Sequence, residues 1–126
     1  MKMQNGLDHF QVYQLANELF DLVVEDVTPL KGEPLCRPLI GQQISSADSI
    51  PANIEEGYGR DSPREYRHYL IIARGSARET RGRYRRMKHW LPQDLIEDRL
   101  NRCDHIIGIL TKVINGMNPP TKSRHP

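Results

Sequence analysis

The chain has 126 residues, of which 27% are charged and 37% hydrophobic, and its formal net charge is +2. This size and balance fit one compact domain over residues 1–126. Two cysteines are too few for a disulfide framework, and no apolar run approaches the ~20 residues that cross a bilayer. With no signal-peptide pattern at the start either, we expect a cytoplasmic protein that makes no membrane contact.

The first predicted helix spans residues 8–27. Apolar residues recur there at helical steps, with polar residues between them. The prolines and glycine of residues 28–34 then end the helix. The expected apolar face consists of Phe10, Tyr13, Phe20, Val23, Val24 and Val27.

The second predicted helix spans residues 36–57, where Ile40 to Tyr58 repeat at steps of three and four. Pro51 falls inside this pattern. We expect a kink there, with nearby serine hydroxyls bonding the freed backbone groups. Gly57 and Gly59 are expected to end the helix with positive φ angles.

The third predicted helix spans residues 63–90 and has the clearest start. Ser62, Pro63 and Glu65 provide an N-cap, a first-turn proline and a capping-box glutamate. Its apolar stripe runs from Tyr66 to Met87.

The fourth predicted helix spans residues 92–115, with an apolar stripe from Leu95 to Ile114. A polar, proline-rich tail at 117–126 is expected to be disordered. No stretch alternates polar and apolar residues as a β-strand does, and the connections between the predicted helices are short. Short connections favour antiparallel neighbours. The sequence therefore predicts an all-α fold, an up-and-down antiparallel four-helix bundle.

Enzyme chemistry and cofactors are not indicated. The chain holds one Glu-x-x-His pair, Glu65 and His68, whereas a di-iron bundle needs two such pairs and two further glutamates. Phosphate-binding glycine loops and nucleophile motifs are missing from the sequence. We expect no catalytic residue, no metal site and no cofactor.

Positive charge is concentrated in one part of the chain. Residues 60–88 hold ten Lys/Arg and three Asp/Glu, so 10 − 3 = +7, and the remainder holds eight and thirteen, so 8 − 13 = −5. At ~100° per residue, six of the basic residues form a ridge beside the apolar stripe, whereas Arg83 and Arg86 point elsewhere and thicken the positive surface. The candidate nucleic-acid-binding residues are Arg67, Arg74, Arg78, Arg81, Arg85, Arg86 and Lys88.

Three interpretations of this ridge stay open. The ridge binds phosphates with salt-dependent affinity, or it pairs with acidic faces of the first two helices within or between subunits, or it is simply solvated. The tyrosines and the tryptophan occupy mostly core positions, so base stacking is not indicated.

Two stretches, Ser49–Arg60 and Ile72–Thr80, resemble the signatures of a bacterial family. This is the four-helix bundle family of proteins encoded in intervening sequences of 23S ribosomal RNA genes, to which the accessory proteins of diversity-generating retroelements are related. The resemblance spans about Phe10 to Asn115. It implies an up-and-down bundle, assembly into a homopentameric ring and, for the retroelement relatives, binding of nucleic acid and of a reverse transcriptase.

The resemblance also implies a tight, hydrogen-bonded contact between the second and third helices, where Gly75 and Ser76 let the backbones approach. The residues of this structural signature are Ser49, Asn53, Glu56, Gly57, Arg60, Gly75, Ser76 and Glu79. We expect a non-enzymatic homo-oligomer that binds RNA or DNA non-specifically. The alternative is an oligomeric scaffold that recruits a protein partner and binds no nucleic acid.

Overall fold

Four α-helices make up most of the residues that the structure describes. The structure is a computed structural model that describes residues 6–117, and this range contains no strand. Part of the expected disordered tail, 118–126, lies outside the described residues. The elements in chain order are α1 (Gly6–Val27), η2 (Thr28–Gly32), α2 (Arg37–Tyr58), α3 (Pro63–Arg86), η3 (Met87–His89) and α4 (Gln93–Gly116).

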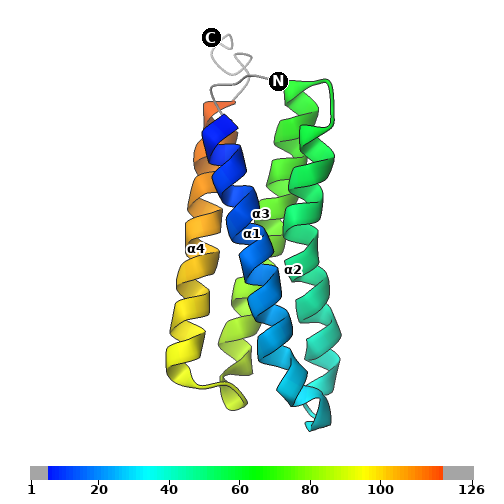
Figure 1. Ribbon diagram of the computed structural model, residues 1–126, viewed down its shortest axis with the longest axis vertical. Helices are drawn as coiled ribbons and strands as arrows, with labels where there is room; N and C mark the ends of the chain where they lie inside the picture. The colour runs from blue at the N-terminus through cyan, green and yellow to red at the C-terminus, as the bar shows by residue number, and fades with distance from the viewer. Residues whose placement is uncertain (1–5, 118–126) are drawn as a thin grey trace, which may run out of the picture.

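The helices form the up-and-down antiparallel bundle that the sequence predicted (Figure 1). α2 packs against α3 and α1, and α4 packs against the same two helices from the other side. α1 and α3 therefore lie diagonally across the bundle and run in the same direction (Figure 1). This diagonal separates the most acidic helix from the most basic one.

The start of α3 is the predicted N-cap. The Ser62 hydroxyl accepts hydrogen bonds from the backbone N–H groups of Arg64 at 3.1 Å and Glu65 at 3.3 Å, and Pro63 occupies the first turn. The helix ends at Arg86 rather than at the predicted residue 90, because the residues that follow form the 3-10 turn η3.

α2 is one helix through Pro51, as predicted, and departs from its prediction at its last turn. The helix continues from Arg37 to Tyr58 with the buried Pro51 inside it, and the hydroxyls of Ser46 and Ser49 bond across to α3. The predicted positive φ at the end is wrong, since Gly59 has φ −79° and no residue within 6–117 has a positive φ.

The buried core corrects the predicted face of α1. Phe10 is 58% exposed and Val24 is 36% exposed, whereas Val12, Ala16 and Leu19 are fully buried. The buried stripe takes the smaller residues at steps of three and four, because α1 lies close against two neighbouring helices. On α3 and α4 the predicted apolar stripes are the ones that face the core.

Candidate nucleic-acid interface

The candidate interface lies on α3, which carries eight arginines and two glutamates in 24 residues, so its net charge is 8 − 2 = +6. The diagonally opposite helix α1 has five acidic residues and no Lys or Arg. The bundle is thus positive on one side and negative on the other, and opposite charges on α1 and α3 lie too far apart to neutralise each other broadly.

Three of the predicted ridge residues are engaged with α4. The Arg67 guanidinium donates to the backbone carbonyl of Ile114 at 3.1 Å, and Arg74 donates to the Thr111 hydroxyl at 3.2 Å. Arg81 forms a two-pronged ion pair with Asp104, at 2.6 and 3.1 Å. These side chains hold α3 to α4.

Arg74 carries an electrostatic cost in this position. Burial, together with the charges of Arg78 and Arg67, lowers its pKa from the ordinary value, and its Nε is buried without a hydrogen-bond partner. Its partner Thr111 is neutral, so the Arg74 charge is not cancelled. The positive potential of α3 therefore persists beside the bonded arginines.

The other four candidate residues point outward. Arg78, Arg85, Arg86 and Lys88 are exposed, and within residues 6–117 none of them makes a hydrogen bond or an ion pair. They cluster in the second half of α3 and in η3, and we call them the basic end of α3. The predicted binding residues therefore divide into three arginines that bond to α4 and four basic residues whose side chains are exposed.

Arg83 was expected to thicken the positive surface, but it points toward α2 and bonds there. Its Nη1 donates to the carbonyl of Gln42 at 3.2 Å, to Gln43 Oε1 at 2.9 Å and to the Ser46 hydroxyl at 2.9 Å. Burial lowers the Arg83 pKa. No sequence pattern predicts these three hydrogen bonds, since they depend on how far apart α2 and α3 lie.

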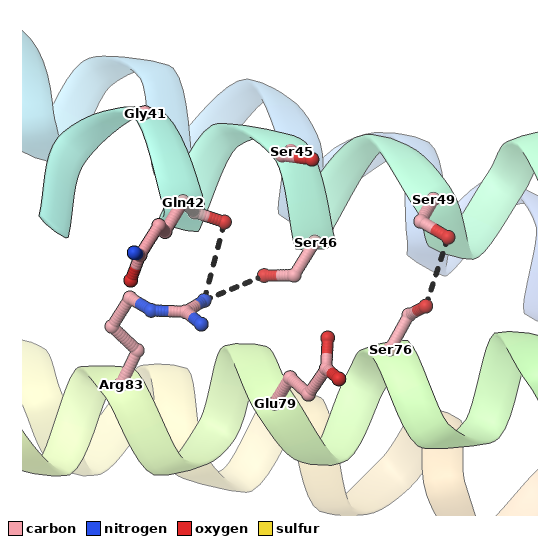
Figure 2. A pocket seen from close by; sticks show the side chains of 8 residues that line it. All are labelled: Gly41, Gln42, Ser45, Ser46, Ser49, Ser76, Glu79 and Arg83. Carbon is pink, nitrogen blue, oxygen red and sulfur yellow. Dashed lines mark hydrogen bonds between the residues drawn. The ribbon is translucent and has the colours of Figure 1, made fainter.

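A shallow polar groove of about 380 Å³ runs beside Arg83 between α2 and α3. Figure 2 shows Arg83 reaching α2 at one end of the groove, Glu79 pointing into its middle and the Ser49–Ser76 contact at the other end. The groove is lined by Gly41, Gln42, Ser45, Ser46, Ser49, Ser76, Glu79 and Arg83.

The contact between α2 and α3 is closed by buried hydrogen bonds, as the family signature implies. The Ser76 hydroxyl donates to Ser49 at 2.9 Å, and Asn53 donates to the same Ser49 hydroxyl at 2.8 Å. Deeper in, the Gln43 amide donates to the carbonyl of Thr80 at 3.0 Å. The Ser49, Ser76, Gln43 and Thr80 groups at this contact therefore satisfy one another across the two helices.

The two signature glycines behave differently. A Cβ on Gly57 would lie 2.8 Å from the Tyr69 Cβ, so Gly57 allows the close approach of α2 and α3. Gly75 does not, because a Cβ there would meet nothing within 4 Å. The expectation that Gly75 lets the backbones approach is wrong, since this residue faces outward from the bundle.

The remaining signature residues lie at the α2–α3 turn and on the groove. The Arg60 guanidinium donates to Glu56 at 2.7 Å and to the Tyr69 hydroxyl at 3.0 Å. Glu79 is exposed and forms none of these bonds across to α2. Arg60 therefore ties the end of α2 to the start of α3.

A buried ionic network that the sequence did not reveal connects α1, α3 and α4. Asp26 accepts two hydrogen bonds from Arg99, at 2.7 and 2.9 Å, and one from the Tyr84 hydroxyl at 2.7 Å. Burial and the bond to Asp26 raise the pKa of Tyr84. The one available signal is an acid, Asp26, on the apolar side of its helix.

Groups suited to metal or nucleophile chemistry are scarce among the described residues. Residues 6–117 contain no cluster of three or more His, Cys, Asp or Glu side chains able to hold a metal ion. Cys36 and Cys103 are free and buried, and burial raises the pKa of Cys103 to about 12. None of the helices in this range is long and apolar enough to span a membrane.

Comparison with known proteins identifies the family. The family model described as 23S rRNA-intervening sequence protein matches residues 8–112. A similar solved structure is a protein of unknown function from the S23 ribosomal protein family of Bacteroides thetaiotaomicron, with a TM-score of 0.80, 23% identity and coverage of 86% of this chain and 98% of that one. No curated protein matches the chain.

Proposed function

We propose, from the premise that this chain belongs to the 23S rRNA-intervening sequence protein family, that it is a non-enzymatic module that binds the phosphate backbone of nucleic acid. One observation carries the proposal. The basic end of α3, which is Arg78, Arg85, Arg86 and Lys88, is exposed and makes no bond within residues 6–117.

The spacing of these residues suits a phosphate backbone. Arg78 and Arg85 are seven residues apart on one face of α3, which is about 10 Å at 1.5 Å per residue. Arginine presents a planar fork of donors that fits phosphate oxygens. The exposed set lacks tyrosine and tryptophan, so stacking on bases is not part of the proposal, and we expect binding without sequence preference.

The rest of the bundle holds α3 rigidly in place, which suits a helix that presents binding residues. Arg67, Arg74 and Arg81 fix α3 against α4, and Arg83 fixes it against α2. The exposed arginines are thereby carried on a helix that is anchored on both sides.

Binding of labelled RNA of unrelated sequences, measured by fluorescence anisotropy across a salt series, tests the proposal. Four phosphate contacts predict that log K falls with log salt with a slope of about −3. Replacing Arg78 and Arg85 by Gln should weaken binding about tenfold, while the control Lys31→Gln with Arg64→Gln, which also removes two charges, should change it less than about twofold. A flat salt dependence would overturn the proposal.

The alternative is a scaffold whose arginines serve subunit contacts. Exposed apolar residues favour it, because Leu7 and Phe10 on α1 and Ile71 and Ile72 on α3 suit a protein surface better than a phosphate. The homopentameric ring that the family resemblance implies remains a prediction, checked by the mass of the protein in solution.

A further inference from the structure

Glu79 is a carboxylate in the middle of the basic helix α3. The other glutamate of this helix, Glu65, lies in the first turn, 3.8 Å from the Arg60 guanidinium. Glu79 is exposed, and within residues 6–117 it makes no hydrogen bond or ion pair. Its two oxygens are therefore free to accept hydrogen bonds from a ligand.

Arg83, one turn further along α3, is the expected ion-pair partner of Glu79, because Glu and Arg at i and i+4 are neighbours on a helix. The Arg83 guanidinium is instead turned to α2, where its Nη1 donates to Gln42, Gln43 and Ser46. All three acceptors are neutral. Figure 2 shows the consequence, since the Glu79 carboxylate points into the groove and no bond joins it to Arg83.

Positive charge therefore remains at the Arg83 end of the groove. The Nη2 of Arg83 reaches solvent and makes no hydrogen bond within residues 6–117. Arg86 follows three residues later on the same side of α3 and is exposed. Burial and the nearby charge of Arg86 lower the pKa of Arg83, and Glu79 only partly offsets this. Two guanidinium groups without a bonded carboxylate attract an anion.

The groove side of α3 presents an acceptor and two donors in a fixed order. Ser76, Glu79, Arg83 and Arg86 follow one another at steps of three and four, so they lie along one side of the helix. At 1.5 Å per residue, position 79 is about 6 Å along the axis from position 83 and about 10 Å from position 86. A ligand that fits carries a hydroxyl for Glu79 and an anionic group for the arginines a few ångströms away.

The lining of the groove selects among such ligands. Besides Glu79 and Arg83 it consists of glycine, serine and glutamine residues, with no apolar or aromatic side chain. A nucleobase would find nothing to stack on there, whereas a sugar and its phosphate find donors and acceptors. The exposed Ser45 hydroxyl adds one more, since it makes no hydrogen bond within residues 6–117.

RNA meets this pattern and DNA does not. Each ribose of RNA carries a 2′-hydroxyl beside the phosphate that follows it, and by this hydroxyl a protein distinguishes RNA from DNA. A carboxylate is an acceptor only, so it bonds the hydroxyl and repels a phosphate. A DNA strand in the groove offers Glu79 no donor and leaves only the repulsion.

We propose that the groove between α2 and α3 binds the ribose of RNA, with the 2′-hydroxyl donating to Glu79 and the adjoining phosphate at Arg83 and Arg86. The strand then continues from the groove onto the basic end of α3, to which Arg86 also belongs. The chain thereby binds RNA more tightly than DNA without reading its sequence. This preference rests on the proposed function, because the basic end must first hold a strand.

Fluorescence anisotropy of the full-length chain with three single strands tests the preference. All three have one sequence of about 12 nucleotides. They are RNA, DNA with deoxyuridine in place of thymidine, and 2′-O-methyl RNA, which keeps the ribose but loses the donor. The variants are Glu79→Ala and the matched control Asp48→Ala, which removes an exposed carboxylate of α2 that does not line the groove. Circular dichroism should show unchanged helix content in both.

We expect the wild type to bind RNA about tenfold more tightly than DNA or 2′-O-methyl RNA, which is the effect of one hydrogen bond to a charged group. Glu79→Ala should bind the three strands about equally. Its affinity for DNA should rise, because a carboxylate that repels phosphate is gone. Asp48→Ala should keep the preference for RNA, since it removes a charge but no acceptor of the hydroxyl.

The results separate this preference from the proposed function. Equal binding of RNA and DNA by the wild type, or a preference for RNA that Glu79→Ala retains, overturns the role of the groove. The proposed function then still stands if binding depends on salt and is weakened by Arg78→Gln with Arg85→Gln. If none of the three strands binds, the proposed function and the preference for RNA are both overturned.

Discussion

The two sides of α3 use similar residues in opposite ways. Toward the neighbouring helices its arginines meet defined partners, as Arg81 meets Asp104 and Arg83 meets Gln43 and Ser46. On the outer side, Arg78 and Arg85 make no bond within residues 6–117. Residue type alone therefore does not assign an arginine of this helix to structure or to binding.

The contrast extends to the glycines and carboxylates. Gly57 is required by a close contact, whereas Gly75 faces open space. Asp26 is buried in a network, whereas Asp21 is exposed. Substitutions on the buried side should change stability, and those on the outer side should change binding.

The largest effect is expected at Asp26. Asp26→Ala leaves the half-buried Arg99 without its carboxylate and Tyr84 without its acceptor, so it should lower the free energy of unfolding by about 3–5 kcal/mol. Urea denaturation followed by circular dichroism measures this. Asp98→Ala removes the exposed partner of Arg99 and Arg102 and should cost under about 1 kcal/mol. If the Asp26→Ala and Asp98→Ala variants lost equal free energies of unfolding, the buried network would not be the stronger of the two.

The glycine pair should show effects of opposite sign. Gly57→Ala places a Cβ 2.8 Å from the Tyr69 Cβ and should destabilise the protein by about 1–3 kcal/mol. Gly75→Ala meets nothing within 4 Å and should stabilise α3 by about 1 kcal/mol. Thermal melts of both variants check this, and a stabilised Gly57→Ala protein would show that α2 and α3 do not pack so closely.

The smallest effect is a pH dependence at the end of the bundle where α1 begins. The Nδ1 of His9 and the Tyr66 hydroxyl share a hydrogen bond of 2.6 Å, and the His9 ring stacks on Tyr58. Burial lowers the pKa of His9 below the ordinary 6.5. The unfolded chain therefore takes up the proton at higher pH than the folded one, so stability is complete above about pH 6.5 and falls as the pH drops through the lowered pKa.

Urea midpoints measured from about pH 7.5 to 5 should record this decline. His9→Gln should flatten it, because the variant has nothing to titrate at this position. The exposed His68→Gln variant is the control and should keep the wild-type profile. A His9→Gln profile identical to that of the wild type would rule out this histidine as its source.

Sequence patterns predicted much of the fold and part of the candidate site. The capping residues at Ser62 and the apolar stripes of α3 and α4 led to the correct elements, because capping and periodicity are local. The face of α1 was wrong at Phe10 and Val24, since the exposure of an apolar residue depends on which neighbours cover it. The bonds of Arg83 and Asp26 were missed for the same reason, because their partners lie 37 or more residues away.

The sequence by itself determined four amphipathic helices, their antiparallel order and the gathering of positive charge on the third. Only the tertiary structure decided which arginines bond to α4 and α2, which ones stay exposed, and that α1 and α3 lie diagonally across the bundle. The physical reason is that charge and periodicity belong to the chain, whereas a partner, a burial cost or a shared height exists only once the helices have packed.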